Sequence, residues 1–326
     1  MSKKILVLAA IMLTLTLVIT SCSVFKDEGK EQGPDVPTIT DEDTDELIRE
    51  TVVYYQDDAG YLVPVMRKIP WAEGIAKATL QVMMDTPDQQ ESLMTMGLRA
   101  ILPAEAEVLG MSIKDGIATV DFNEAVLNCK DAAAENNMVQ GIVMTLAGFS
   151  TIEKVQLLFD GKTIETMQFG TVVKDPIDPL DINIEMSDDA STQGAKVTVF
   201  FQSTSSSQYE YLIPITRITS SMNVTPETAI QELLDGPRDA DNMTIDIPQD
   251  TKLLGVQMED GVTYINFSKE FNSLSTSASS EAMVFKAIMM VARQFPEVEQ
   301  VNILVEGKNY VGAKPVNSTP VFANEY

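Results

Sequence analysis

The chain has 326 residues, 44% of them hydrophobic, and carries 23 basic against 48 acidic residues, for a net charge of −25. Such an acidic chain excludes nucleic acid as its main ligand, because phosphates need lysine and arginine, and it disfavours lying flat on an anionic membrane. The sequence contains no histidine, the commonest general base of enzymes. Its length predicts two domains.

The N-terminus has the pattern of an export signal. Lys3 and Lys4 precede an apolar run from Ile5 to Ile19, and small residues then lead to Cys22. This pattern resembles the signal of bacterial lipoproteins, in which the cysteine thiol is acylated and the peptide is cut before it. We therefore expect a lipoprotein signal peptide at 1–21, lipidation of Cys22 and a cell-membrane anchor on the extracytoplasmic side. The alternative is a plain signal peptide with a chance cysteine.

An acidic segment follows the signal. Residues 22–47 contain nine acidic side chains with two glycines and two prolines, which predicts a disordered tether behind the lipidated cysteine. The run DEDTDE at 41–46 lacks the glycine and the ligand spacing of an EF-hand loop, so we interpret it as solvated charge. We predict no metal site and no cofactor. Cys129 would then be the single remaining thiol, and it is expected to pack as a small hydrophobe.

A long internal repeat decides the architecture. YLVPVMR at 61–67 returns as YLIPITR at 211–217, and further pairs follow in the same order. The pairs include DTP with DGP, LG with LG, DG with DG, DFN with NFS and GK with GK. A duplication of a whole domain explains this order. The predicted organisation is a first domain at 48–170, an acidic proline-containing linker at 171–193, a second domain at 194–316 and a C-terminal tail at 317–326.

Each copy shows one series of expected elements. Two β-rich strands come first, then a helix, a hairpin over Asp-Gly, a second helix and a closing strand. In the first copy these are 51–56, 61–69, 72–85, 107–114 with 117–122, 132–147 and 153–159. In the second copy the later elements are 226–235, 252–259 with 262–267, 280–293 and 299–305. The fold class is therefore α+β: two tandem small sandwiches of mixed β-sheet with helices on one face.

The paired motifs resemble the GerM-domain family of sporulation and germination lipoproteins. The resemblance rests on YL[VI]P[VI]xR, D[TG]P, LG…DG…[DN]F[NS] and [ED]GK, in both copies and in one order. It implies a fold like the ring-building motif of proteins in the channel between mother cell and forespore. It also implies a structural role outside the cytoplasm, with no established catalysis.

Carboxylates are the one catalytic alternative that the residues leave open. Asp121 and Glu124 could act as the acid and the nucleophile of a cell-wall hydrolase. The second copy has Asn266 in place of Asp121, so this position tolerates a side chain without a charge. In the structural interpretation, Asp121 ends a strand, Asn123 and Ser268 cap the next helix, and Glu124 lies in its first turn.

Other repeated residues have structural interpretations too. Pro64 and Pro214 lie inside expected strands, which indicates an edge strand or a bulge. Arg67 and Arg217 are expected to pair with an acidic side chain, and binding of a ligand is the alternative.

Tyr61 and Tyr211 are expected to be half-buried platforms rather than to stack on a ligand. Asp85 and Asp235 are expected to end a helix before a proline. The longer loop of the first copy, 88–102, is predicted to form an extra turn over the core, or else an adaptable methionine-rich contact surface.

Two functional classes follow from these observations. The first is an assembly protein whose partners are proteins of the sporulation channel complex, with the membrane reached through the lipid anchor. The second is a binding module for a cell-envelope ligand such as peptidoglycan. An assembly protein should show partly apolar faces or exposed strand edges, whereas a ligand module should show a concave pocket with convergent polar groups.

Overall fold

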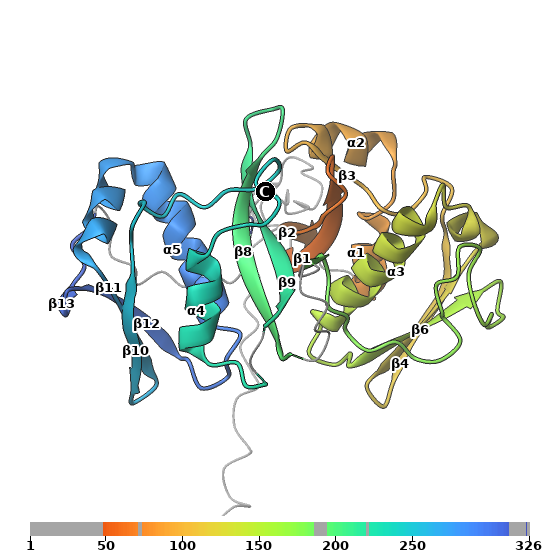
Figure 1. Ribbon diagram of the computed structural model, residues 1–326. Helices are drawn as coiled ribbons and strands as arrows, with labels where there is room; N and C mark the ends of the chain where they lie inside the picture. Colours follow the sequence, from red (N-terminus) through yellow and green to blue (C-terminus); the bar gives the residue numbers. More distant parts are fainter. Residues whose placement is uncertain (1–47, 71–73, 186–193, 220–221, 313–323, 325–326) are drawn as a thin grey trace, which may run out of the picture. The chain divides into compact units, whose positions relative to one another are not determined.

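A computed structural model describes residues 48–70, 74–185, 194–219, 222–312 and 324 (Figure 1). The predicted signal, Cys22 and the acidic tether lie outside the described residues. Residues 46–326 form one compact unit that contains both copies of the repeat. Its apolar core is continuous and contains buried side chains from both copies.

Each copy begins with an antiparallel hairpin. In the first copy β1 (Ile48–Asp57) pairs with β2 (Leu62–Pro70), and the short β3 (Leu98–Arg99) adds to the other edge of β1. In the second copy β8 (Lys196–Thr204) pairs with β9 (Glu210–Ile218). These hairpins form sheets of their own, separate from the strands that follow.

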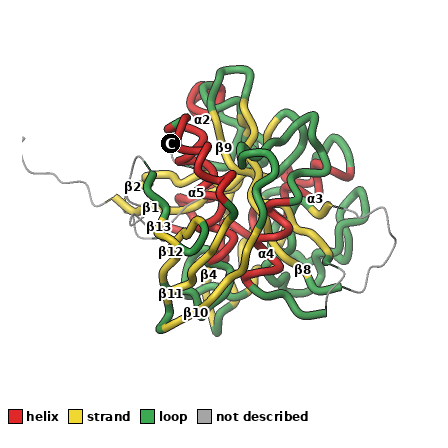
Figure 2. Tube along the Cα trace, turned by 60° about the vertical axis from the view of Figure 1, so that its left-hand side comes forward, coloured by secondary structure: helices red, strands yellow, loops and turns green. Residues whose placement is uncertain are grey.

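Each copy continues with a small mixed sheet, as predicted. The first consists of β4 (Val108–Lys114), β5 (Ile117–Phe122) and β6 (Lys154–Phe159). The second consists of β10 (Leu253–Glu259), β11 (Val262–Phe267), β12 (Gln300–Val305) and β13 (Lys308–Asn309) (Figure 2). In both sheets the two hairpin strands are antiparallel: β4 with β5, and β10 with β11. The next strand pairs in parallel: β6 with β5, and β12 with β11. A helix makes each parallel crossover: α3 (Ala132–Ala147) and α5 (Ala278–Ala292).

The predicted Asp-Gly turns are confirmed. Asp115 and Gly116 have φ values of 51° and 78°, and Asp260 and Gly261 have values of 50° and 78°. Two consecutive positive φ angles define the type I′ turn, whose twist matches that of the flanking strands. The same dipeptide therefore sets the register of both hairpins.

The first helix of the second copy starts where it was predicted, whereas that of the first copy is shorter than predicted. In the second copy α4 (Pro226–Leu234) starts as predicted, with the hydroxyl of Thr225 accepting the Thr228 N–H. In the first copy α1 covers only Ile75–Gln81, shorter than the expected 72–85. The chain leaves the helix early because the backbone of Met83 to Asp85 bonds to Leu102 instead.

The longer loop of the first copy forms an extra turn over the core, as predicted. Helix α2 (Pro87–Met94) begins after Thr86, and it is followed by β3. Leu93, Met96 and Leu98 are buried, whereas Met94 is exposed. This insertion therefore adds to the apolar core of the first copy.

The linker packs against both copies instead of running free. Ile177 exchanges two backbone hydrogen bonds with Val155 of β6, at 2.8 and 2.9 Å, and Ile182 is buried. Further on, β7 (Ile184–Glu185) pairs in parallel with β9. The linker was expected to be extended, with Leu180, Ile182 and Ile184 able to pack onto a domain. Ile182 is buried, whereas Ile184 is 47% exposed. Residues 186–193 lie outside the described part.

The two repeated prolines lie in different settings. Pro64 is on β2, an edge strand, as expected. Pro214 is on β9, between β7 and β8, so the expectation of an edge strand is wrong for the second copy. The proline is tolerated because β7 pairs only with Thr216 and Arg217 and does not reach it.

Candidate functional site

The two candidate catalytic carboxylates lie near the end of β5 and at the start of the 3-10 helix that follows it. The Oδ1 atom of Asp121 accepts a hydrogen bond from the Gly161 N–H at 2.8 Å, and Glu124 is exposed at the start of a 3-10 helix. In the second copy Asn266 Oδ1 accepts the equivalent bond from the Gly307 N–H at 2.9 Å. Since an amide and a carboxylate make the same contact, the position requires only an acceptor oxygen.

Asn123 and Ser268 were expected to cap the helices that follow them. Both precede a 3-10 helix, but neither side chain accepts a capping bond from its backbone, although Ser268 Oγ donates to Glu270 Oε2 at 2.6 Å. Asn123 instead bonds backwards to the N–H of Glu107 and the carbonyl of Glu105, at 3.1 and 2.9 Å. Ser268 Oγ accepts the Lys252 N–H at 3.0 Å. The predicted capping is wrong because these side chains form hydrogen bonds with backbone groups of the loop that leads into the hairpin.

Arg217 is a buried structural residue. Its side chain is 2% exposed and forms an ion pair with Glu185 of β7. Its guanidinium also donates to the carbonyls of Glu232 and Gly236, at 2.7 and 2.6 Å, and lies 5.0 Å from the ring centre of Phe201. The predicted pairing with an acid is confirmed, and the linker supplies that acid.

Arg67, the counterpart of Arg217, has other neighbours. Its guanidinium donates to Ser92 Oγ and Gln89 Oε1, at 3.1 and 3.4 Å, and lies 5.8 Å from the ring centre of Tyr55. Ser92 and Gln89 belong to α2, the helix inserted in the first copy. The two arginines therefore anchor different segments: α2 in one copy and the linker in the other.

The repeated tyrosines connect the two copies. The Tyr61 hydroxyl donates to Asp239 Oδ2 at 2.7 Å, and the Tyr211 hydroxyl donates to Asp57 Oδ2 at 3.2 Å. Burial raises the pKa of Tyr211 to about 12. Each tyrosine thus crosses from its own copy to the other, a role that the sequence did not predict. We call the region where β2 and β9 approach each other the inter-copy interface.

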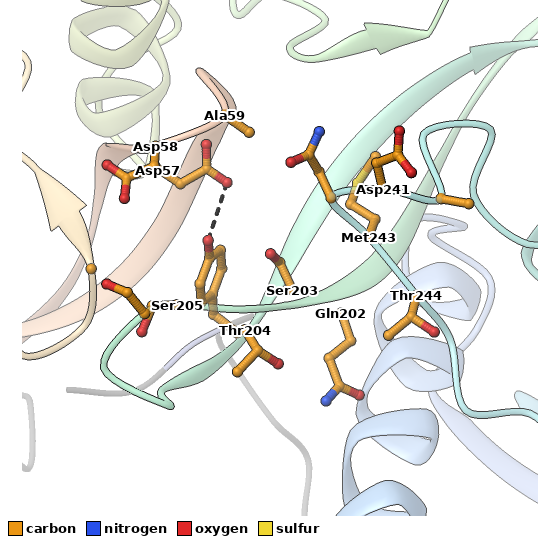
Figure 3. A pocket seen from close by; sticks show the side chains of 15 residues that line it. Asp57, Asp58, Ala59, Gln202, Ser203, Thr204, Ser205, Asp241, Met243 and Thr244 are labelled. Carbon is orange, nitrogen blue, oxygen red and sulfur yellow. Dashed lines mark hydrogen bonds between the residues drawn. The ribbon is translucent and has the colours of Figure 1, made fainter.

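A polar cleft of about 330 Å³ lies beside the bond between Tyr211 and Asp57 (Figure 3). Both copies line it, mostly with hydroxyl and carboxylate groups, among them Asp57, Asp58, Ser203, Thr204, Asp241 and Thr244. Burial raises the pKa of Asp57 above its ordinary value, although the Tyr61 N–H and the Tyr211 hydroxyl donate to the carboxylate. A lining of this kind suits a hydroxylated ligand such as a sugar.

Both mixed sheets end in an edge strand with exposed apolar side chains. In β4, Leu109 and Ile113 are each 45% exposed. At the equivalent positions of β10, Leu254 is 49% exposed and Met258 is 42% exposed. We call these four residues the edge-strand pairs. An exposed apolar edge strand favours pairing with another chain, and folded proteins usually protect such edges.

Cys129 is not an activated thiol. Cys129 is half-buried, and burial together with Glu135 raises the pKa of its thiol to about 11, which keeps it protonated. Within the described ranges, no group of three or more acidic or cysteine side chains is placed to hold a metal ion. No helix of the described part is long and apolar enough to cross a membrane.

Comparison with known proteins agrees with this duplicated fold. The chain matches the Germane family, described as sporulation and spore germination, over residues 52–165 and 198–311. It is 31% identical over 266 residues to the spore germination protein GerM of Bacillus subtilis (strain 168), covering 79% of this chain and 71% of that protein.

A solved structure matches both copies together. It contains the tandem GerMN domains of the sporulation protein GerM from Bacillus subtilis, with a TM-score of 0.72 and 29% sequence identity. The match covers 85% of this chain and 99% of that chain. With two family matches that span most of its described residues, this chain belongs to the Germane family of sporulation and spore germination proteins.

Proposed function

We propose that this protein is an extracytoplasmic assembly lipoprotein of sporulation and germination. It is anchored to the cell membrane through Cys22, and it supports the channel complex between mother cell and forespore by protein–protein contacts. It turns over no substrate of its own. Membership of the Germane family supports the sporulation role, and the edge-strand pairs support the mode of action.

The edge-strand pairs are the observation that carries the proposal. Leu109 and Ile113 on β4 have equivalents in Leu254 and Met258 on β10, so each copy presents the same kind of surface. A partner strand added to such an edge would gain backbone hydrogen bonds and would cover the exposed apolar side chains. Two equivalent surfaces in one chain also let a repetitive partner bind at two points, which strengthens binding without new contacts.

Charge indicates the chemistry of the partner. With a net charge of −25, this protein repels a second copy of itself and attracts a basic surface. Complementary charge mainly raises the rate of association and excludes wrong partners. We therefore expect the docking segment of the partner to be an extended, apolar strand flanked by lysine or arginine.

The decisive experiment removes the apolar side chains and keeps the strands. In the variant Ile113→Thr with Met258→Thr, threonine preserves strand propensity. Capture of channel proteins from sporulating cells, followed by titration with the purified partner, should show at least about tenfold weaker binding, because covering even one such side chain contributes about 1.5–3 kcal/mol.

The matched control is Ser112→Ala with Gln257→Ala, which changes exposed polar residues on the same two strands. It should bind like the unchanged protein. Equal affinity of both double variants for the partner would exclude the edge strands as the docking surface.

Anchoring is tested separately. Replacing Cys22 by alanine should abolish labelling of the protein by a palmitate analogue and release it from the membrane fraction, because two acyl chains are needed for stable anchoring. Cys129→Ser is the control, and it should leave the labelling unchanged. Persistent labelling of the Cys22 variant would contradict the lipoprotein assignment.

The hydrolase alternative has weaker support. It needs Asp121 as a reacting group, but that carboxylate bonds to a turn amide, and Asn266 makes the same bond. A cell-wall assay of the purified protein tests this alternative directly. Release of sugar fragments that stops in the Glu124→Gln variant would replace the assembly function with catalysis.

The polar cleft favours a second candidate function, binding of the glycan of the cell wall. Its hydroxyl and carboxylate groups, such as those of Ser203 and Asp241, can bond to sugar hydroxyls. Calorimetric titration with soluble glycan fragments tests this candidate. Heat of binding that disappears in Asp241→Ala would support it, and no binding at millimolar ligand would exclude it.

A further inference from the structure

Asn183 of the linker holds backbone groups of both copies. Its Oδ1 accepts the Leu62 N–H of β2 at 2.9 Å, and its Nδ2 donates to the Leu62 carbonyl at 2.8 Å. The same Nδ2 donates to the Pro214 carbonyl of β9 at 2.8 Å. In addition, the backbone carbonyl of Asn183 accepts the Thr216 N–H at 3.3 Å.

Asn324, near the C-terminus, makes the same set of contacts with the copies exchanged. Its Oδ1 accepts the Leu212 N–H of β9 at 2.6 Å, and its Nδ2 donates to the Leu212 carbonyl at 2.8 Å. The same Nδ2 donates to the Pro64 carbonyl of β2 at 2.8 Å. Its backbone carbonyl accepts the Met66 N–H at 2.9 Å, and the residue is only 3% exposed.

The two sets of contacts are related by the duplication. Leu62 and Pro64 are the counterparts of Leu212 and Pro214 in the repeated stretch, so the two asparagines exchange equivalent partners. Each asparagine also follows a proline by four positions, in PLDIN at 179–183 and in PVFAN at 320–324. The duplicated unit therefore includes a trailing asparagine, beyond the domain limits that the sequence motifs indicate. We call Asn183 and Asn324 the asparagine pair.

Asparagine is suited to this position for chemical reasons. Its short side chain carries both an acceptor oxygen and two N–H donors, so one group can satisfy an N–H and two carbonyls. Aspartate lacks the donors, and leucine lacks both functions. Backbone groups left unpaired at a buried interface cost stability, and the asparagine pair satisfies those of both strands. Asn183 also has a φ of 50°, a conformation that asparagine tolerates better than most residues.

We propose that the asparagine pair locks the two copies into one rigid body, and that the C-terminal segment is required for the lock through Asn324. Each asparagine bonds to both strands of the inter-copy interface, so loss of either one loosens the contacts of the other. The two edge strands β4 and β10 are then presented at a fixed separation. The lock is a property of the fold and does not depend on the identity of any partner.

Amide hydrogen exchange of the purified protein tests this coupling. The variant Asn324→Ala removes contacts to Leu212 and Pro64, yet the amides to watch are those of Leu62 and Thr216, which bond to Asn183. If the lock is cooperative, these amides, which do not bond to Asn324, should exchange at least about tenfold faster, the effect expected when one or two net hydrogen bonds are lost. Asn183→Ala should do the reverse and accelerate exchange at Leu212 and Met66.

Controls separate the lock from general destabilisation. Val143 inside α3 reports global unfolding, and its exchange should stay unchanged in both variants. Asn136→Ala, at an exposed position of the same helix, should leave all four interface amides unchanged. Acceleration confined to Leu212 in Asn324→Ala, with Leu62 and Thr216 as in the unchanged protein, would overturn the proposal.

A truncation provides a second route if the point variants fold poorly. Ending the chain after residue 323 removes Asn324 while every helix and strand of both copies remains. Far-ultraviolet circular dichroism should then be unchanged, and the distance between spin labels on Asp115→Cys and Asp260→Cys, in a Cys129→Ser background, should broaden from one narrow distribution to several. A single narrow distribution after truncation would show that Asn324 does not hold the copies together.

Discussion

Asp121 and Asn266 hold the same turn amide at equivalent positions of the two copies. Asp121 accepts the Gly161 N–H at 2.8 Å, and Asn266 accepts the Gly307 N–H at 2.9 Å. A negative charge is therefore not required at this position. The duplication gives an internal comparison, because one copy shows what the other would do with the neutral side chain.

The substitution Asp121→Asn should be nearly neutral. The free energy of unfolding should change by less than about 0.5 kcal/mol, since the amide keeps the acceptor oxygen, whereas Asp121→Ala should cost about 1 kcal/mol. Urea denaturation of the three proteins measures this. A loss of partner binding in Asp121→Asn with unchanged stability would show that the charge has a functional role.

Glu135 should make the protein sensitive to acid. Burial alone would raise the pKa of this carboxyl, but the Phe169 and Thr171 N–H groups donate to it at 2.8 and 3.0 Å, and the net effect is a lowered pKa. The stability from the ionised form is therefore complete above the ordinary glutamate pKa of 4.5 and disappears as the pH falls through the lowered value.

The variant Glu135→Gln should lose stability at neutral pH and show a flatter decline of stability below pH 4.5 than the unchanged protein. Chemical denaturation between neutral pH and pH 2 measures the difference (about five pH values suffice to define the slope). The control Glu105→Gln, at an exposed position, should leave the loss of stability in acid unchanged. Identical pH profiles for Glu135→Gln and the unchanged protein would contradict this prediction.

Tyr211→Phe should weaken the inter-copy interface in a pH-dependent way. Burial raises the pKa of Asp57 above 3.8. The Tyr211 hydroxyl donates to this carboxyl and stabilises its ionised form, and phenylalanine lacks that hydroxyl. A raised carboxyl pKa means that ionisation opposes folding, and removing the bond increases this opposition. The substitution should therefore cost about 1 kcal/mol at neutral pH and less in acid, where Asp57 is protonated.

Urea denaturation at neutral pH and at pH 3 or below measures this effect, because the ordinary carboxyl pKa of Asp57 is 3.8. The control variant Tyr264→Phe distinguishes it from a general loss of packing. Tyr264 lies on β11, away from Asp57 in the sequence, and is half-buried. The same cost at both pH values would show that Tyr211 acts through packing and not through the Asp57 carboxylate.

Arg217→Met should be far more damaging than Arg67→Met. Arg217 is buried, and its loss leaves the largely buried Glu185 paired with the more exposed Arg238 at 3.8 Å, so we expect a cost of about 3 kcal/mol. Arg67 is half-buried and bonds to the neutral side chains of Ser92 and Gln89, so its replacement should cost about 1 kcal/mol. Thermal unfolding of both variants measures the contrast.

The double variant Arg217→Met with Glu185→Gln completes the test. It should recover part of the lost stability, because the largely buried carboxylate of Glu185 is removed together with Arg217, its nearest cation. A cost for Arg217→Met no larger than that for Arg67→Met would show that the ion pair with the linker contributes nothing.

Much of each copy could be predicted from the sequence, because its signals are local. Asp-Gly dipeptides force positive φ angles, so the turns at 115–116 and 260–261 follow from two residues each. Thr225 followed by proline specifies the start of α4 in the same way. Repetition of these signals was sufficient to reveal the duplication and the α+β class.

The limits of local signals appear at α1 and at Asn123. The predicted helix over 72–85 was expected to end just before Pro87, yet it ends at Gln81 because Leu102 takes the backbone bonds of the following residues. Asn123 was expected to serve as a cap and instead bonds to the loop before β4. In both cases a contact from a distant part of the chain prevailed over the local preference.

The sequence by itself determined the two copies, most of the helices and strands of each, and the absence of histidine from the chain. Only the tertiary structure decided how the copies meet: that Tyr61 and Tyr211 cross between them, that Glu185 of the linker pairs with Arg217, and that the asparagine pair bonds to β2 and β9. The physical reason is that hydrophobic period and turn chemistry act over a few residues, whereas these contacts join groups more than a hundred positions apart, or groups brought together only by packing. Which donor meets which acceptor is then fixed by the geometry of the folded chain, and no spacing in the sequence encodes it.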